Sequence, residues 1–360
     1  MSRIANKPRS LRLDENYLPT VSFVIPTHNE AEIINFKLRN IVRVDYPKSL
    51  LQYIIVDSNS DDNTMRIIRD FAKLHPHLDF LILSQAQKGK SVALNSALKH
   101  VKGDIVVVSD ADCFYPSNIL RKSLLYLSDP KVGAISGPKI LLNRDGSNIT
   151  GAEGRYLGLM NLVKLGESRL GFTTLFEGGF SAYKKEALSS FDPYKTGSDD
   201  CGSVIKLAEN AYNALFVPEA MFFTTFPASR KERLRMKIRR ANQLVRVFKE
   251  YLTLLLQRRI RVTKRVVLTN TFIYLFSSIF FALFVPVTMW ILIGYPYLAV
   301  ILLILFVPKV GSILIEVIQS YLVLFISLFM VALKRKFLIW TKPADRKLLS
   351  EKMLNQHNLI

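Results

Sequence analysis

The chain has 360 residues, 49% of them hydrophobic, and a formal net charge of +20. This length allows one large α/β domain plus a further region. Two distant cysteines, Cys113 and Cys201, and five histidines without paired ligand spacing argue against a disulfide scaffold and a zinc site. Residues 1–16 lack an apolar core of signal-peptide length, so we expect a reducing, cytosolic setting for the first domain.

The positive charge is concentrated in one stretch of the chain. Residues 230–265 hold fourteen Lys and Arg against two Glu, and long apolar runs follow directly. Cytoplasmic flanks of membrane helices have this composition and are attracted to anionic headgroups. We therefore expect a membrane partner and no nucleic acid, because nucleic-acid proteins more often interleave such charges with exposed aromatics on a soluble domain.

The first part of the chain alternates between strand and helix patterns. Short apolar, β-branched runs predict strands at 21–26, 52–57, 79–84 and 105–109, with helical patterns between them and another strand at 132–140. This alternation predicts a parallel sheet with helices on both faces. In such sheets ligands bind just outside the carboxyl ends of the strands.

Two carboxylates follow the fourth predicted strand. Asp110 and Asp112 are separated only by Ala111. Two acids at this edge can hold a hard divalent cation, which prefers oxygen ligands and leaves positions open for substrate phosphates. A solvated acidic turn is the alternative interpretation of the pair taken alone.

Four segments together resemble a known family. They are VSFVIPTHNE, VDSNSDDNT, KGKSVALNSAL and VVVSDAD, within residues 21–112. Their order and spacing resemble the family 2 glycosyltransferases, whose domain has the Rossmann-like GT-A fold. The resemblance implies a nucleotide-sugar donor and a Mg²⁺ or Mn²⁺ cofactor. It also implies roles for single residues: Thr27 and Asp57 hold the base, Glu30 lines the cleft, Lys90 lies near the ribose and phosphates, Asp110 contacts ribose and metal, and Asp112 coordinates the metal.

Two later segments extend the resemblance. In LFEGGFSAYKKEAL, the family's counterpart forms the far wall of the donor site, where Gly178 and Gly179 would let backbone approach the sugar. Each glycine alone is equally consistent with a tight turn. The run of Ser198, Asp199 and Asp200 resembles the family's Thr-Glu-Asp, whose last acid is the general base.

An inverting transfer needs a base opposite the departing diphosphate. We expect Asp200 to be that base, with Asp199 as the second candidate. The alternative is structural, with Ser198 capping a helix and both acids in its first turn. Neighbouring helical residues point about 100° apart, so only one of the two acids can face an acceptor hydroxyl.

A basic amphipathic helix is predicted after residue 229. Gln243 and Arg246 resemble the QxxRW motif of cellulose, hyaluronan and poly-N-acetylglucosamine synthases, in which these residues close over the active site. Val247 replaces the tryptophan, which puts processive polymer synthesis in doubt. Arg239, Gln243 and Arg246 recur on one face, as they also would in a helix that only lies in the membrane interface.

Apolar runs fill most of the remaining chain. Val266–Ile293, interrupted by Pro286, and Gly311–Leu333 are long enough to span a membrane, whereas Tyr297–Val307 is short. Glu316 is expected to face a neighbouring helix or a polar cavity. We expect two to four crossings with both flanks cytoplasmic. The predicted division is a segment 1–20, a GT-A domain 21–228, interfacial helices 229–265, transmembrane helices 266–333 and a basic tail 334–360 that includes Trp340.

These features predict an integral membrane enzyme with a cytoplasmic catalytic domain. It would be an inverting, metal-dependent glycosyltransferase that moves a sugar from a nucleotide-diphosphate donor, UDP-sugar favoured, to a lipid-linked glycan or polysaccharide. Synthesis of a polyprenyl-phosphate sugar is the alternative within enzymes, and it would require no base because a phosphate acceptor is already ionised. A non-catalytic sugar-nucleotide-binding membrane protein is the alternative of another class.

Overall fold

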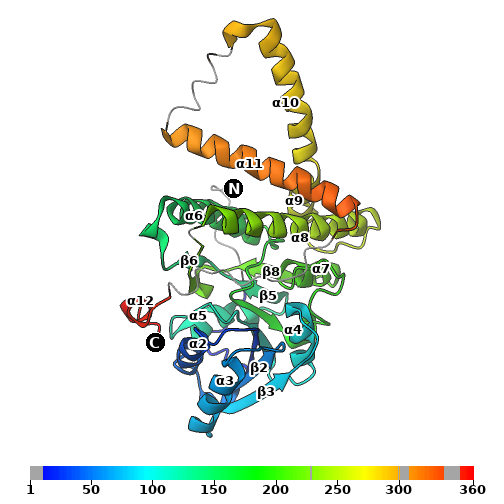
Figure 1. Ribbon diagram of the computed structural model, residues 1–360. Coiled ribbons are helices and arrows are strands. Elements are labelled where there is room, and N and C mark those ends of the chain that lie inside the picture. The colour runs from blue at the N-terminus through cyan, green and yellow to red at the C-terminus, as the bar shows by residue number, and fades with distance from the viewer. Residues whose placement is uncertain (1–10, 228, 299, 301–307, 336–348) are drawn as a thin grey trace.

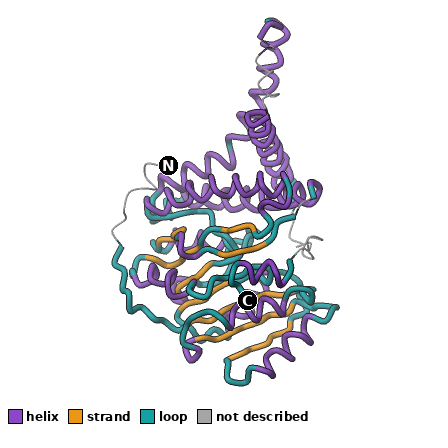
Figure 2. The backbone as a smooth tube through the Cα atoms, turned by 90° about the vertical axis from the view of Figure 1, so that its left-hand side faces the viewer, coloured by secondary structure: helices purple, strands orange, loops and turns teal. Residues whose placement is uncertain are grey.

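The structure is a computed structural model that describes residues 11–227, 229–298, 300, 308–335 and 349–360. The expectations for the apolar segment 301–307 and for Trp340 concern residues outside these ranges. Figures 1 and 2 show two stacked parts, a sheet domain below and a layer of long helices above it.

A seven-stranded sheet forms the centre of the domain, in the order β3-β2-β1-β4-β7-β5-β8. Strands β1 to β4 pair in parallel, but β7 is antiparallel to both β4 and β5. The parallel pairing predicted for the first four strands is confirmed, and the antiparallel β7, which the sequence did not predict, makes the whole sheet mixed. Its strands are β1 (Val21–Thr27), β2 (Leu51–Asp57), β3 (Asp79–Ser84), β4 (Ile105–Val108), β5 (Val132–Ser136), β7 (Ser181–Lys184) and β8 (Asn213–Phe216).

The strand predicted at 132–140 is divided between two sheets. After β5 the chain turns at Gly137, where an added Cβ would lie 2.2 Å from the carbonyl oxygen of Ala220. Pro138 follows and has no amide hydrogen to donate to a ladder. The chain then forms β6 (Lys139–Leu141), which pairs in parallel with β9 (Phe222–Thr224).

Helices cover both faces of the main sheet. Alternate residues of β1 point to opposite faces, so Phe23 and Ile25 join the core under α2, α3 and α5, while Val24 joins the core under α4 and α7. The helices are α2 (Ile34–Val42), α3 (Thr64–Leu74), α4 (Lys90–Leu98), α5 (Ile119–Ser123), α6 (Asn148–Arg169) and α7 (Cys201–Glu209).

The upper layer contains the basic helix and the apolar helices. Its elements are α8 (Arg230–Leu256), α9 (Lys264–Leu275), α10 (Ser277–Gly294) and α11 (Pro308–Ala332), which lie over the domain together with α6. Within the described ranges, two helices are long and apolar enough to cross a membrane, Ser277–Gly294 and Leu314–Ala332. The run 266–293 changes helix at Phe276, and Pro286 lies inside α10, so the interruption predicted at Pro286 was wrong.

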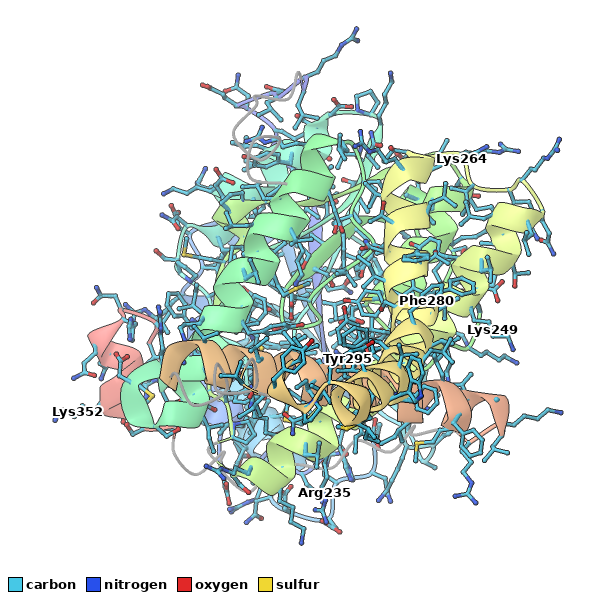
Figure 3. All side chains as sticks on the ribbon, turned by 90° about the horizontal axis from the view of Figure 1, so that it is seen from above. Arg235, Lys249, Lys264, Phe280, Tyr295 and Lys352 are labelled. Atoms are coloured by element: carbon cyan, nitrogen blue, oxygen red, sulfur yellow. The ribbon has the colours of Figure 1, made fainter. Side chains whose placement is uncertain are left out.

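The two apolar helices differ in how they meet the domain. α10 points away from the sheet domain. Large side chains of α10 are exposed, with Trp290 76% and Ile293 81% exposed. α11 crosses above α8, as Figure 3 shows from above. There Glu316 accepts hydrogen bonds from Arg233 at 2.6 and 3.1 Å and from Lys237 at 2.6 Å. Glu316 therefore faces a neighbouring helix, as the cost of a lipid-facing acid requires.

A last short helix returns to the sheet domain. α12 (Glu351–Gln356) lies beside that domain in Figure 1, on the far side of the helical layer from α10. Leu354 and Leu359 are buried in the same core as α2. The side-chain amide of Asn40 donates to the carbonyl of Leu359 at 2.7 Å, and Arg39 pairs with Glu351 at 2.6 Å. Residues 349–360 are therefore a docked part of the domain rather than a free tail.

Candidate active site

The carboxyl edge of the sheet collects the first group of candidate residues. In the parallel register Thr27, the last residue of β1, is paired with Asp57, the last residue of β2. β4 ends at Val108, so Asp110 leaves the sheet at the same edge. Residues far apart in sequence meet here because parallel strands end on one side, where α/β sheets bind ligands.

Asp57 is buried in a local hydrogen-bonded turn. Its carboxylate accepts from the Ser60 amide at 3.0 Å and from the Ser60 hydroxyl, and the Thr27 hydroxyl lies 3.3 Å from it. Glu30 is also buried, and its amide donates to the Thr64 hydroxyl at 2.7 Å. These contacts fix the turn after β2 against the turn after β1.

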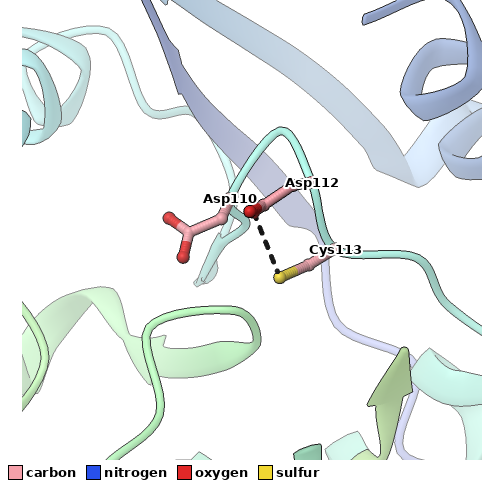
Figure 4. Close-up of side chains that lie close together, drawn as sticks. All are labelled: Asp110, Asp112 and Cys113. Carbon is pink, nitrogen blue, oxygen red and sulfur yellow. Dashed lines mark hydrogen bonds between the residues drawn. The ribbon is translucent and has the colours of Figure 1, made fainter. Parts of the chain in front are cut away.

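Asp110, Asp112 and Cys113 form a compact group on the loop after β4. Each offers one ligand atom, and these atoms lie within 4.8 Å of one another (Figure 4). The Cys113 thiol lies 3.6 Å from an oxygen of Asp112. Burial, followed by the charges of Asp112 and Asp110, raises the pKa of Cys113 well above its usual range. The donors suited to a hard cation are the two carboxylates, and they fit Mg²⁺ or Mn²⁺.

Lys90 joins this loop to a second acidic segment. It begins α4, and its Nζ lies 2.7 Å from Asp110 Oδ1 and 2.7 Å from Asp199 Oδ2. Burial lowers the pKa of Lys90, but Asp110, Asp199 and Asp200 outweigh it and hold the pKa well above the usual value. A cation fixed between these acids reduces their mutual repulsion and allows them to share one site.

The two glycines form the opposite wall, and β7 brings them there. Because β7 is antiparallel to β4, Ser181 at its start pairs with Val108 at the end of β4. A Cβ on Gly178 would lie 2.9 Å from Lys90 Nζ, 3.4 Å from Asp200 Oδ2 and 3.7 Å from Asp110 Oδ2. The absence of a side chain at Gly178 therefore leaves room among three charged groups.

Asp199 and Asp200 occupy different positions from those expected. α7 begins at Cys201 with Asp200 as its N-cap, so both acids precede the helix, and the prediction that Ser198 caps it was wrong. Asp200 Oδ1 accepts from the Cys201 amide at 2.7 Å and from the Ser198 hydroxyl at 2.5 Å. Burial raises the pKa of Asp199 to about 6, with Asp200 and Asp110 adding to the effect and Lys90 opposing it.

The basic helix α8 meets the acidic segment through Gln243, one of the two residues of the predicted QxxRW-like motif. The side-chain amide of Gln243 donates to the Gly197 carbonyl at 2.5 Å, next to the acidic segment. Arg246, however, donates to Asn242 at 3.1 Å and to the Arg335 carbonyl at 2.7 Å. The structure therefore does not bring Arg246 to the carboxylates.

Arg239 lies one helical turn before Gln243, on the same face of α8. Burial and Arg240 lower the pKa of Arg239, while the charges of Asp110, Asp199 and Asp200 raise it, which places its guanidinium in their field. Its Nε is buried and has no hydrogen-bond partner among the described residues. The available signal was the helical stripe that Arg239 shares with Gln243 and Arg246, but choosing among these arginines required the rotation of the helix.

A buried ion pair lies beside the glycines. Glu177 pairs with Lys164 of α6. Burial alone would raise the pKa of Glu177, but Lys164, Lys139 and Arg240 outweigh it and lower the pKa to about 2. The pair joins the glycine wall to α6.

Comparison with known proteins accounts for this arrangement. Residues 22–191 match the sequence profile of the family described as glycosyl transferase family 2. These residues form a family 2 glycosyltransferase domain. A mannosyltransferase from Pyrobaculum calidifontis, solved in complex with GDP-Man and Mn²⁺, is 27% identical. It superposes with a TM-score of 0.75 over 91% of this chain and 92% of its own, so the GT-A fold and the helices that follow it are confirmed as an arrangement shared with that protein.

Two curated relatives are also similar to this chain. A probable glycosyltransferase of Bacillus subtilis is 29% identical over 246 residues, covering 63% of this chain and 56% of the relative. The poly-β-1,6-N-acetyl-D-glucosamine synthase of Staphylococcus epidermidis is 28% identical over 235 residues, covering 62% of this chain and 54% of the relative. The chain spans about half the length of these curated relatives. They support the predicted likeness to polysaccharide synthases.

Proposed function

We propose that this protein is an inverting glycosyltransferase that moves one sugar from a nucleoside-diphosphate donor to a hydroxyl of a membrane-associated glycan. The observation that carries the proposal is the cluster around Gly178, where Lys90, Asp110 and Asp200 all approach one backbone position. The cluster unites the donor residues at the sheet edge with an acid suited to activate an acceptor. The similarity to a mannosyltransferase solved with GDP-Man and to N-acetylglucosamine polymer synthases supports a hexose donor.

The donor would lie along the carboxyl edge of the sheet. Thr27 and Asp57 end adjacent strands and would hold the base, with Glu30 in the same cleft. Asp110 and Asp112 would hold Mg²⁺ or Mn²⁺, which neutralises the charge that develops on the departing diphosphate. Lys90 and Arg239 would add fixed positive charge on the diphosphate side, because preorganised charges cost no rearrangement during the reaction. Gly178 and Gly179 would admit the sugar against bare backbone.

Asp200 would serve as the base for the acceptor hydroxyl. Its Oδ1 is fixed by the Ser198 hydroxyl and the Cys201 amide, while its Oδ2 faces the Gly178 wall. A carboxylate held by one oxygen presents the other in a defined direction, as general base catalysis requires. Asp199 forms an ion pair with Lys90 at 2.7 Å, so its proposed role is to balance the positive charge of Lys90.

The acceptor would arrive from the membrane side. α10 exposes an apolar surface, and Figure 3 shows Arg235, Lys249 and Lys264 around the rim of the helical layer, as expected of a cytoplasmic interface. Residues 349–360 follow the apolar helices in the sequence and dock on the sheet domain that precedes them. If α10 is inserted in a membrane, this docking requires an even number of crossings. We place the catalytic domain and residues 349–360 together on the cytoplasmic side.

Donor hydrolysis tests this proposal. Purified protein in detergent with Mn²⁺ is offered GDP-mannose, UDP-N-acetylglucosamine and other UDP- and GDP-sugars, and release of the nucleoside diphosphate is followed without acceptor. We expect release from one donor, and its loss in Asp112→Ala. The matched control is Asp61→Ala, an exposed acid on the turn after β2. Neither hydrolysis nor calorimetric binding of any donor would refute the transferase assignment.

A further inference from the structure

Lys37 carries a buried amine that no role described above uses. It lies on α2 with 0% of its surface exposed. Its Nζ donates to the carbonyl of Cys113 at 2.6 Å and lies 3.9 Å from the ring centroid of Tyr115. Burial lowers its pKa to about 7, against the opposing effects of Cys113, Asp110 and Asp112. Burying an amine is costly unless it is hydrogen-bonded, and here its partner is the backbone of the acidic loop.

Tyr115 extends this contact to the opposite wall of the site. Its hydroxyl donates to the carbonyl of Gly179 at 2.6 Å. Asn40, one turn after Lys37 on α2, accepts from the Tyr115 amide at 2.9 Å and donates to its carbonyl at 2.8 Å. A Cβ on Gly179 would lie 2.6 Å from Cys113 Sγ, so the two walls also touch directly. Tyr115 thus joins the loop 110–115 to the glycine wall, while Lys37 and Asn40 of α2 hold the loop from its other side.

We propose that Lys37 is a positioning residue that holds the loop 110–115 against the Gly178–Gly179 wall and thereby sets Asp110 and Asp112 for a divalent cation. The proposal rests on the metal site of the proposed function. It assigns to α2 a task beyond packing, because a side chain serving only the core would be apolar at this depth. Lys37 acts through the Cys113 carbonyl and does not touch the metal or the sugar.

The two cysteines allow a direct test in the full chain. Cys113 is 3% and Cys201 5% exposed, so alkylation of each reports local opening. N-ethylmaleimide labelling of both peptides is followed by mass spectrometry in wild type, Lys37→Met, Tyr115→Phe and Lys48→Met. Lys48 is the matched control, because its Nζ donates to the Val42 and Val44 carbonyls at 2.7 and 2.6 Å without contacting the acidic loop.

We expect Cys113 labelling to rise about tenfold in Lys37→Met, because this change removes one buried hydrogen bond. The rise should be smaller in Tyr115→Phe, and Cys201 should keep its rate in both variants. Lys48→Met should change neither rate. The charge effect has the opposite sign, because Lys37 lowers the pKa of Cys113 and its removal makes the thiol less reactive. Faster labelling therefore reports loop movement. Unchanged Cys113 labelling in both Lys37→Met and Tyr115→Phe would overturn the proposal.

Mn²⁺ binding provides the second readout, measured by electron paramagnetic resonance without donor. We expect Lys37→Met to raise the dissociation constant about tenfold, although removing a nearby cation should by itself tighten binding. Equal or tighter binding by Lys37→Met would refute the positioning role and leave the transferase assignment untouched. Failure of the wild type to bind Mn²⁺ would instead refute the metal site, and the proposal with it.

Discussion

The sheet edge and the helical layer contribute to the site under different physical constraints. At the edge, Thr27 and Asp57 are the last residues of two paired parallel strands, and Asp110 comes just after the end of a third. In the helical layer, Arg239, Gln243 and Arg246 share one stripe, yet they behave differently. Gln243 bonds to the acidic segment, Arg239 lies in the field of its carboxylates, and Arg246 bonds to Arg335 instead. The position of a residue at a strand end can be predicted from where the apolar run stops. The direction of a helical side chain also depends on the rotation and tilt of its helix.

The largest expected effect tests the junction of the two regions. Asp200→Asn should lower transfer to a hydroxyl acceptor by about 10³-fold, because it removes the proposed base and keeps the shape. Donor hydrolysis and sugar transfer are measured side by side. Ser198→Ala, which removes the hydroxyl that holds Asp200 Oδ1, separates loss of orientation from loss of the base. Near-normal transfer by Asp200→Asn would favour the polyprenyl-phosphate alternative, in which the acceptor is already ionised.

The two arginines of α8 give the sharpest contrast within the helical layer. Arg239→Ala should reduce kcat/KM for the donor by about 10²-fold, since it removes a fixed charge from the diphosphate side. Arg246→Ala should change it by less than about threefold, because Arg246 caps the Arg335 carbonyl. Steady-state kinetics on both variants measure which of the two arginines acts on the donor. A larger loss in Arg246→Ala would restore the interpretation based on the QxxRW motif.

The ion pair at the glycine wall links the two regions and should make stability depend on pH. Glu177 has a folded pKa of about 2, below the ordinary value of 4.5, so its contribution is complete above about pH 4.5 and is lost as the pH falls toward 2. Glu177→Gln should lower the free energy of unfolding at pH 7 by about 2 kcal/mol and flatten this acid limb. Thermal unfolding from pH 7 to pH 3 measures both. If Glu177→Gln lost stability with falling pH as the wild type does, the ion pair would not be the cause of the pH dependence.

The smallest effect concerns the contact between α8 and α11. Glu316→Gln should destabilise the protein by about 1 kcal/mol, because Glu316 is over one-third exposed and its pairs with Arg233 and Lys237 are partly screened. Gln319→Ala, which removes a neighbouring contact of Lys237 at 3.1 Å, serves as the control. Melting temperatures in detergent provide the comparison. Equal melting of both variants would show that apolar packing alone holds α11.

Sequence reasoning succeeded where a residue's position follows from local pattern. The four glycosyltransferase segments predicted the GT-A fold, and the profile match over residues 22–191 confirms it. Asp110 and Asp112 were placed correctly beyond a buried strand, because an apolar β-branched run ended by acids is a local signal. The composition of residues 266–293 likewise indicated a candidate span without reference to the rest of the chain, and Ser277–Gly294 is the helix within it that is long enough.

The remaining features depended on contacts between distant segments. The antiparallel direction of β7 brings Gly178 to Asp110. This direction is set by the pairing of β7 with β4 and β5, and it cannot be predicted from the four residues of the strand alone. Docking of residues 349–360 on Asn40, the burial of Lys37 beneath Cys113 and the choice of Arg239 are of the same kind. The sequence by itself determined which residues end strands and which runs are apolar. Tertiary packing alone decided which side chains meet, because rotation, tilt and strand direction are set by the partners that each element contacts.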